Sequence, residues 1–350
     1  MDKKLTIVIP AYEPDSHLPE LIDNLNNFFN DFNIIVVNDG SKNCDEIFND
    51  VKQKKNVLVL NHKVNKGKGE ALKTAFRYIK DNKMESVIVT ADSDGQHKPL
   101  DIKRIYEFYL AHNGGLVLGS RKFENEVPAR SRFGNDVSRG LMRMCLHKHL
   151  NDTQTGLRAF DSNLLDFMLN VKGSKFEYEM NMLSETVRNN IRIRELKIET
   201  IYIDENKGSH FRPVRDFLKI SNSICKYKIT FLLTLVLDFV LFFVFSKALA
   251  NLGEYAYIHA SYISSVLSVG AYLVMNLTSI LYGDGNILRQ KKLPLISGLV
   301  LYVGLNVLIV YLFKLFLGNL LVDKVISLFI ILVLDLVLNF FVLRKSKLYE

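Results

Sequence analysis

The sequence predicts an α/β domain with a mostly parallel sheet over residues 1–222, followed by an all-α transmembrane domain over residues 229–345. Two observations support this division. In the first part, short β-branched runs alternate with amphipathic stretches, which is typical of a parallel sheet covered by helices. From residue 229 onward the chain is mostly apolar, in four segments of the length that crosses a bilayer.

The first domain contains five apolar runs that predict strands, at residues 5–9, 34–37, 56–60, 86–90 and 116–118. We expect Pro10 to end the first of them. Helices are predicted from Ser16, and again from the stretch 66–69, because apolar residues follow at helical spacing. In such sheets ligands bind beyond the carboxyl ends of the strands. The strand ends Ala11-Tyr12-Glu13, Asp39 and 92–96 should therefore gather at one edge.

The stretch 89–99, VTADSDGQHKP, organises the rest of the domain. Asp92, Asp94 and Gln96 occupy alternate positions after a strand, so their side chains should point the same way. Such oxygen ligands suit Mg²⁺ or Mn²⁺. The alternative interpretation is a surface turn rich in aspartate and glycine, because a bare D-x-D arises easily by chance.

Composition narrows the classes of function. The formal net charge of +8 and pI of about 9.1 fit nucleic acid or an anionic membrane surface. Cys44, Cys145 and Cys225 are scattered, which indicates neither a metal site nor a disulfide framework. The N-terminal apolar run is too short for a signal peptide. The pair Gly67 and Gly69 fits neither a dinucleotide fingerprint nor a P-loop.

Five segments in order, IVIPAYEP, VVNDGS, NKGKG, TADSDGQH and GSR, carry a resemblance. Together they resemble a family 2 glycosyltransferase with the GT-A fold. Within that family the similarity is to the dolichyl-phosphate mannosyltransferase branch and its bacterial polyprenyl-phosphate relatives, over residues 4–222. Five motifs in the right order are far more specific than any one of them.

The resemblance implies a role for each motif residue. The expected nucleotide-binding residues are Pro10, Ala11, Tyr12, Glu13, Asp39, Lys66, Gly67 and Asp92. The metal is expected at Asp94 and Gln96 with Asp92, and the acceptor phosphate at Ser120, Arg121, Arg132 and Arg212. The expected catalytic residues are Asp92 and Asp152, the second as candidate base. Asp152 serves alternatively to position other groups, because a lipid phosphate is already ionised near neutral pH.

Other motif residues keep a structural alternative. Tyr12 and Glu13 also fit a simple strand-end turn, and Arg139 and Arg143 fit a solvated amphipathic helix. The stretch 176–179, FEYE, matches an acidic motif of the family, and an acidic first helical turn is its alternative.

The second half reads as a membrane anchor. A basic amphipathic stretch from about residue 206 should lie on an anionic leaflet, and spans are expected near 229–252, 256–282, 294–318 and 320–343. The loop with Arg289, Lys291 and Lys292 and the basic C-terminus should be cytoplasmic, whereas Glu254, Asp323 and Lys324 belong to the opposite loops. The layout is similar to the small GtrA-type membrane domain.

Two aspartates inside these spans, Asp238 and Asp335, lie at similar depth from the cytoplasmic edge. Because a carboxylate facing lipid costs at least about 2.5 kcal/mol, both should face the bundle interior. We expect the first and fourth spans to be neighbours, with at least one carboxyl protonated or hydrogen-bonded. The alternative role is structural, as polar groups that hold spans together.

The sequence thus predicts a metal-dependent, multi-pass membrane glycosyltransferase with a cytoplasmic catalytic domain and C-terminus. It would transfer one sugar, with inversion, from a UDP- or GDP-sugar to a polyprenyl phosphate of the undecaprenyl type, for cell-envelope glycosylation. No nucleic-acid partner is expected, and homo-oligomer formation stays open. The alternatives are a lipid-linked sugar translocase or scaffold and a transferase with a different membrane acceptor. A processive synthase is disfavoured, because related synthases carry a Q-x-x-R-W motif and this chain has no tryptophan.

Overall fold

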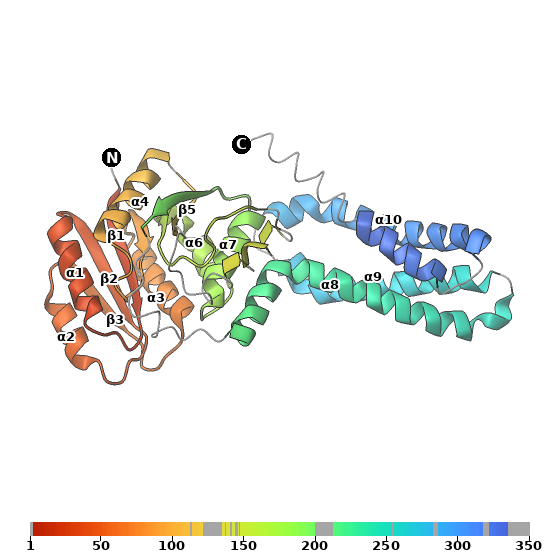
Figure 1. Cartoon of the computed structure of the whole chain (residues 1–350), viewed down its shortest axis with the longest axis horizontal. Helices are drawn as coiled ribbons and strands as arrows, with labels where there is room; N and C mark the ends of the chain where they lie inside the picture. Colours follow the sequence, from red (N-terminus) through yellow and green to blue (C-terminus); the bar gives the residue numbers. More distant parts are fainter. Residues whose placement is uncertain are drawn as a thin grey trace. The chain divides into compact units, whose positions relative to one another are not determined.

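The structure is a computed structural model. It describes residues 3–112, 114–121, 135–136, 138–140, 142–143, 146, 148–199, 213–253, 255–282, 286–317 and 322–334, without side chains at 213–229, 276–298 and 315–317. The chain divides into two compact units, Met1–Cys225 and Lys226–Glu350 (Figure 1).

The first unit is built on a seven-stranded sheet in the order β3-β2-β1-β4-β6-β5-β7. Its strands are β1 (Lys4–Ala11), β2 (Phe32–Asn38), β3 (Val57–Asn61), β4 (Ser86–Thr90), β5 (Leu116–Arg121), β6 (Arg158–Asp161) and β7 (Ile193–Ile198). All pair in parallel except β6, which runs antiparallel to β4 and β5. The predicted mostly parallel sheet is therefore confirmed.

Helices cover both faces of this sheet. They are α1 (His17–Phe28), α2 (Asp45–Gln53), α3 (Lys68–Asp81), α4 (Pro99–His112), α6 (Leu165–Asn170) and α7 (Glu177–Arg188), with a 3₁₀ turn η1 (Ser162–Leu164). Alternate residues of one strand enter different cores: Ile7 packs with α1, α2 and α4, whereas Val8 packs with α3, α6 and α7. The domain is thus a three-layer α/β/α structure.

The expectation that Pro10 ends the first strand is wrong. β1 continues to Ala11, with Pro10 paired opposite Val37 of β2. On its other side β4 ends at Thr90, opposite Val8. No ladder bond to β4 is therefore lost where proline lacks its N–H, so the strand tolerates it.

The second unit consists of long apolar helices. They are α8 (Pro213–Ala248, which begins within the first unit), α9 (Ala256–Tyr282) and α10 (Asn286–Leu317), with a 3₁₀ turn η3 (Ala250–Leu252) and helical residues at 322–334. By length and composition, two segments suffice to cross a membrane: Thr230–Ala248 and Ala256–Met275, with mean hydropathies of 2.1 and 1.4. The predicted count of four spans stays a prediction.

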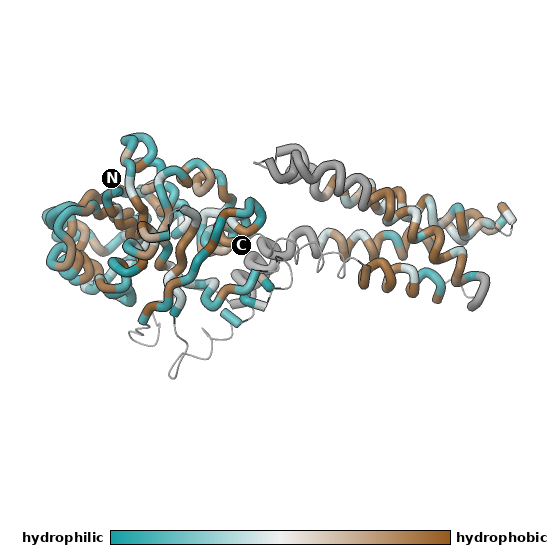
Figure 2. Tube along the Cα trace, turned by 90° about the horizontal axis from the view of Figure 1, so that it is seen from above, coloured by the Kyte–Doolittle hydropathy of each residue, from teal (hydrophilic) through white to brown (hydrophobic). Residues whose placement is uncertain are grey.

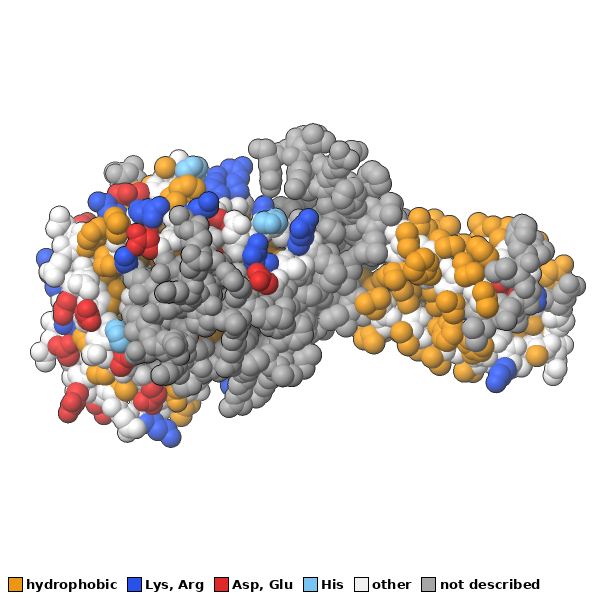
Figure 3. All heavy atoms as spheres, viewed as in Figure 1, with side chains coloured by type: hydrophobic (Ala, Val, Ile, Leu, Met, Phe, Trp, Pro, Cys, Tyr) orange, Lys and Arg blue, Asp and Glu red, His pale blue; other side chains and the backbone are white. Residues whose placement is uncertain are grey.

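The described surface of this second unit is strongly apolar. Hydrophobic residues predominate along its helices (Figure 2), and hydrophobic side chains make up much of the visible face of the described part (Figure 3). Exposed examples on α8 are Val236, Val240 and Val244, one turn apart. Such a continuous apolar face on a helix is typical of contact with lipid.

A polar cluster lies inside this apolar unit. We call it the Asp238 cluster, and its members, all nine-tenths or more buried, are Asp238, Ser264, Ser265, Tyr302, Asn306, Lys324 and Ser327. The Asp238 carboxylate accepts hydrogen bonds from Ser264 Oγ (2.5 Å), Tyr302 Oη (2.8 Å) and the amide of Asn306. Lys324 Nζ completes it, 3.1 and 3.0 Å from the two carboxylate oxygens.

The cluster decides two expectations. Asp238 does face the bundle interior and is hydrogen-bonded, as predicted, and the first and fourth helical segments are neighbours, since Leu235 and Ile331 share a core. Lys324 was assigned to a loop, and that is wrong: it is helical and fully buried, because Asp238 supplies its counter-charge. Asp335 lies outside the described residues.

Candidate active site

The polar residues of the first unit meet at the edge where parallel strands end. β1, β2, β4 and β5 all finish at this edge, and antiparallel β6 starts there. β1, β2 and β4 are mostly apolar and buried, so the chain turns polar where these strands leave the sheet. This is the edge at which ligands bind in open parallel sheets.

Asp39, just beyond β2, shapes the loop that precedes α3. Its carboxylate accepts hydrogen bonds from the backbone N–H groups of Lys66 (2.9 Å) and Gly67 (2.7 Å), while His62 Nδ1 lies 2.6 Å away. Gly67 has a φ of 99°, which glycine adopts without strain. The structure thus brings Asp39, Lys66 and Gly67 together, with the Asp39 carboxylate buried beneath the loop.

Glu13, at the end of β1, holds the turn that follows Asp39. Its Oε1 accepts a hydrogen bond from the Lys42 N–H (2.9 Å), and its own N–H donates to Ser41 Oγ (2.9 Å). The hydrogen bonds from Lys42 and from the Cys44 thiol lower the pKa of Glu13. Tyr12 beside it is partly exposed, so an aromatic face and a fixed carboxylate border the same strand ends.

The two carboxylates after β4 have different surroundings. Asp92 Oδ1 lies 2.7 Å from Lys68 Nζ, and His97 Nε2 lies 3.6 Å from Asp92 Oδ2. Burial raises the pKa of Asp92, but Lys68 and His97 outweigh it and hold that pKa below its usual value. Asp94 is exposed, and both incomplete solvation and the neighbouring Asp92 raise its pKa.

This pair of carboxylates fits a divalent cation only in part. A cation beside Asp94 would relieve its repulsion from Asp92, and Asp94 Oδ1 accepts just one backbone hydrogen bond that the structure assigns, from Gln96 (3.1 Å). Within the described ranges, no group of three or more His, Cys, Asp or Glu side chains forms a metal-binding cluster. A metal at Asp94 and Gln96 would therefore complete its shell with donor phosphates and water, as Mg²⁺ usually does.

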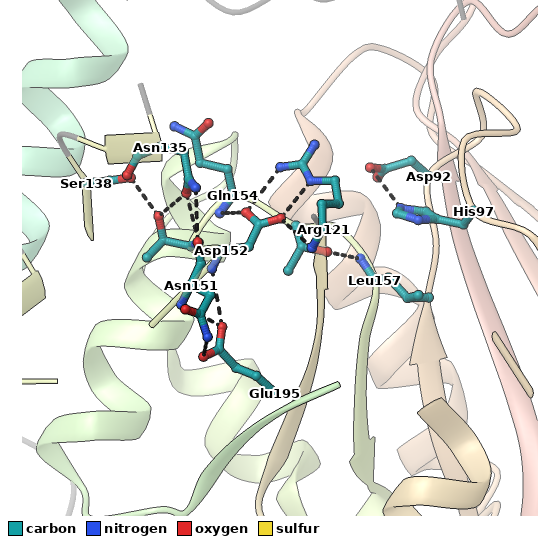
Figure 4. A network of polar contacts seen from close by, with 12 residues as sticks. Asp92, His97, Arg121, Asn135, Ser138, Asn151, Asp152, Gln154, Leu157 and Glu195 are labelled. Carbon is teal, nitrogen blue, oxygen red and sulfur yellow. Dashed lines mark hydrogen bonds and ion pairs between the residues drawn. The ribbon is translucent and has the colours of Figure 1, made fainter. Parts of the chain in front are cut away.

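The loop 152–156 ties two parts of the site together (Figure 4). Asp152 is fully buried and binds Arg121, which ends β5, through Nε (2.6 Å) and Nη2 (3.2 Å). The backbone N–H groups of Arg121 and Gln154 also donate to this carboxylate. Four residues on, Gly156 packs against the Asp92 carboxylate so closely that any Cβ would collide with it.

The surroundings of Asp152 define its role. Both of its oxygens already accept two hydrogen bonds, and the side chain has no exposed surface. Such a carboxylate orients the Arg121 guanidinium, which itself is partly exposed. This geometry favours the positioning role over that of a base.

The other predicted site residues are placed as follows. Pro10 and Ala11 are buried in the last part of β1, and Ser120 is buried in β5 next to Arg121. Arg132 and Arg212 lie outside the described residues, so their grouping with Arg121 stays a prediction. Arg139 donates to the Leu150 carbonyl (3.1 Å) and pairs with Asp136, which supports its structural alternative.

Sequence reasoning missed three residues that build this site. His62 follows β3 and supports Asp39, while Lys68 begins α3 and contacts Asp92. Glu195 of β7 accepts hydrogen bonds from the Asn151 and Asp152 N–H groups (2.8 and 3.2 Å) and so holds the loop 152–156. Only Lys68 carried a signal, because it stands within the NKGKG motif. His62 directly follows β3 and Glu195 lies within β7, and neither belongs to a recognisable motif.

Comparison with known proteins identifies the class. The model of "Glycosyl transferase family 2" matches residues 6–167. The UDP-N-acetylglucosamine–dolichyl-phosphate N-acetylglucosaminyltransferase of Methanococcus voltae is 30% identical over 227 residues, covering 58% of this chain and 88% of that protein. The chain therefore belongs to glycosyltransferase family 2.

Two further likenesses are more distant. The undecaprenyl-phosphate mannosyltransferase of Micrococcus luteus is 27% identical over 207 residues, covering 56% of this chain and 82% of that protein. Among solved structures, the chain resembles glucosyl-3-phosphoglycerate synthase of Mycobacterium tuberculosis in complex with Mn²⁺, UDP-glucose and phosphoglyceric acid, with 17% identity and a TM-score of 0.49. That likeness covers 64% of this chain and 80% of the other.

Proposed function

We propose that this glycosyltransferase moves one sugar, with inversion, from a UDP- or GDP-sugar to a polyprenyl phosphate at the cytoplasmic face of a membrane. The observation that carries the proposal is the partly exposed Arg121 guanidinium, which Asp152 holds in one orientation. Asp152 belongs to the loop 152–156, and this loop also contacts Asp92 through Gly156. An arginine fork matches phosphate oxygens. The dolichyl- and undecaprenyl-phosphate transferases among the relatives and the apolar helices of the second unit support a lipid acceptor.

The donor would occupy the edge formed by β1, β2 and β4. Tyr12, Glu13 and the loop held by Asp39 border the part suited to a base and ribose, with Asp94 and Gln96 toward the diphosphate. A divalent cation there would neutralise the negative charge of the departing nucleoside diphosphate. The Asp92 carboxylate, with Lys68 beside one oxygen and His97 beside the other, would accept hydrogen bonds from sugar hydroxyls.

The reaction needs positioning more than proton transfer. An oxygen of the lipid phosphate attacks the anomeric carbon while the bond from that carbon to the diphosphate oxygen breaks. Since the phosphate is already ionised near neutral pH, no base must remove a proton. Arg121 would orient the phosphate, and the fixed charges around Asp92 would orient the sugar, so that the two reacting atoms meet in line.

The test is turnover by the purified full chain in detergent. It is incubated with polyprenyl phosphate, Mn²⁺ or Mg²⁺ and each of a panel of radiolabelled UDP- and GDP-sugars, and label is counted in the organic phase. Label released from the lipid by mild acid supports transfer to phosphate. Binding of a nucleotide-sugar without transfer to any lipid would favour the scaffold alternative.

The same assay tests the metal. Asp94→Asn removes the exposed carboxylate proposed to hold it, so transfer should fall at least about 100-fold, and EDTA should abolish transfer by the native protein until Mn²⁺ or Mg²⁺ is restored. Asp50→Asn, an exposed aspartate on α2, is the matched control and should behave as native. Normal turnover by Asp94→Asn at limiting metal would contradict the assignment.

A further inference from the structure

The first residue of α3, Lys68, lies between two carboxylates from different elements. Its Nζ is 2.7 Å from Asp92 Oδ1, beyond β4, and 2.9 Å from Glu179 Oε2, on the first turn of α7. All three side chains are largely buried. Burial alone would lower the pKa of Lys68, but the two carboxylates outweigh it and raise that pKa.

The placement of Lys68 is enforced by the chain around it. The preceding residue, Gly67, donates its N–H to Asp39 and turns the backbone into the helix, and the Glu70 N–H donates to the Ser174 carbonyl (2.9 Å). A cation at the N-terminus of a helix is disfavoured by the helix dipole. Lys68 is therefore held there by Asp92 and Glu179, against the preference of α3 itself.

This contact separates the tasks of the two aspartates after β4. Asp92 is bounded by Lys68 on one oxygen and by His97 and Gly156 on the other, so its carboxylate has one orientation. Asp94, two residues on, is exposed and lacks such a clamp among the interactions that the structure assigns. The first carboxylate is suited to a fixed hydrogen-bonding task, and the second to a ligand that arrives from solvent.

We propose that Lys68 is a positioning residue for the donor sugar: with Glu179 as its anchor, it holds Asp92 in the orientation that binds sugar hydroxyls. This inference rests on the proposed function, because it assigns the sugar to Asp92. Hydrogen bonds to an ionised acceptor are roughly twice as strong as neutral ones, so a fixed carboxylate discriminates a sugar-bearing donor from the bare nucleoside diphosphate. Without Lys68, Asp92 would rotate toward whichever donor or cation is near.

The inference predicts that loss of Lys68 weakens binding of the sugar part of the donor and leaves binding of the nucleotide part nearly unchanged. Calorimetry on the full chain compares UDP with UDP-N-acetylglucosamine and GDP with GDP-mannose, in Mn²⁺, so that each pair isolates the contribution of the sugar. In Lys68→Met the sugar contribution to affinity should fall about 10- to 100-fold, while the affinity for the bare diphosphate changes by less than about threefold. Where turnover is measurable, kcat/KM should fall by a similar factor.

Conservative variants separate positioning from general stability. Lys68→Arg keeps the charge and should recover most of the loss, and Glu179→Gln should show a smaller loss in the same direction. Lys80→Met, at the far end of α3 and paired with Asp166, is the matched control and should bind as native. If Lys68→Met does not fold, the comparison of Lys68→Arg with Glu179→Gln decides the question by the same binding readout.

The outcomes are distinct. Equal weakening of diphosphate and nucleotide-sugar, or an unchanged sugar contribution in both Lys68→Met and Glu179→Gln, overturns the role of Lys68. A native protein that binds no donor better than its bare diphosphate overturns it as well. A sugar-selective loss in a protein that transfers to no lipid phosphate supports Lys68 while it refutes the proposed acceptor, so the two proposals fail separately.

Discussion

The ion pair inside the second unit allows a quantitative prediction. Asp238→Leu removes the common acceptor of the Asp238 cluster and leaves the Lys324 ammonium buried, with Asn306 Oδ1 3.2 Å away. Removing one partner of a buried ion pair costs about 3–5 kcal/mol. We therefore expect Asp238→Leu to destabilise the second unit by that amount.

The reciprocal change should be milder. In Lys324→Met the Asp238 carboxylate keeps the hydrogen bonds from Ser264, Tyr302 and Asn306. Hydrogen bonds inside membrane proteins contribute about 0.6 kcal/mol on average, so these three offset roughly 2 kcal/mol of the cost. The expected loss is about 1–3 kcal/mol. The double variant should be more stable than Asp238→Leu alone, because it leaves no unpaired charge buried.

The assay is limited proteolysis of the full chain in detergent, with fragments from residues 230–334 read by mass spectrometry. When reclosing outpaces cleavage, the cleavage rate follows the population of the opened form, and each 1.4 kcal/mol raises it tenfold. Asp238→Leu should thus be cleaved at least about 100-fold faster than native. Lys247→Met, an exposed lysine near the end of α8, is the control and should stay within about twofold. Less than a fivefold change in Asp238→Leu, or strictly additive losses in the double variant, would refute the reasoning.

The remaining predictions concern the first unit. Arg121→Ala should reduce kcat/KM for the lipid phosphate about 10- to 100-fold and leave nucleotide affinity within threefold, and Asp152→Asn should show a smaller loss in the same direction. Kinetics at varied lipid concentration check both variants. A selective loss of nucleotide binding would contradict the prediction. Asp39→Asn should lower nucleotide affinity about tenfold and expose the loop with Lys66 and Gly67 to protease, because the amide cannot accept both backbone N–H groups; native affinity in this variant would contradict the role of Asp39.

Much of the first unit was predictable because its strands are buried β-branched runs. The five predicted strands, near residues 5–9, 34–37, 56–60, 86–90 and 116–118, were all found, with ends that differ by at most three residues, whereas β6 and β7 were not predicted. β6 was missed for a physical reason: it is four residues long, begins with Arg158 and ends with Asp161. A buried arginine that donates to backbone carbonyls does not produce an apolar pattern.

The site was predictable in its members and less so in their contacts. Motif order named Asp39, Asp92, Arg121 and Asp152, but no spacing indicates that Asp152 binds Arg121 or that Asp92 contacts Lys68. Those contacts depend on how a loop returns to the sheet. In the second unit the depth argument placed Asp238 inside the bundle and overlooked Lys324, because a lysine at the end of an apolar run resembles an ordinary loop residue.

The loop 152–156 has a consequence for redesign. Asp152 at one end of the loop holds Arg121 of β5, and Gly156 at the other end packs on the Asp92 carboxylate beyond β4. The five residues of the loop therefore set the distance between the acceptor part and the donor part of the site. A chain of this length spans at most about 14 Å between its end Cα atoms. Anyone who grafts a different sugar preference onto this scaffold must keep the length of that loop, because one inserted residue would shift the acceptor end relative to the donor end.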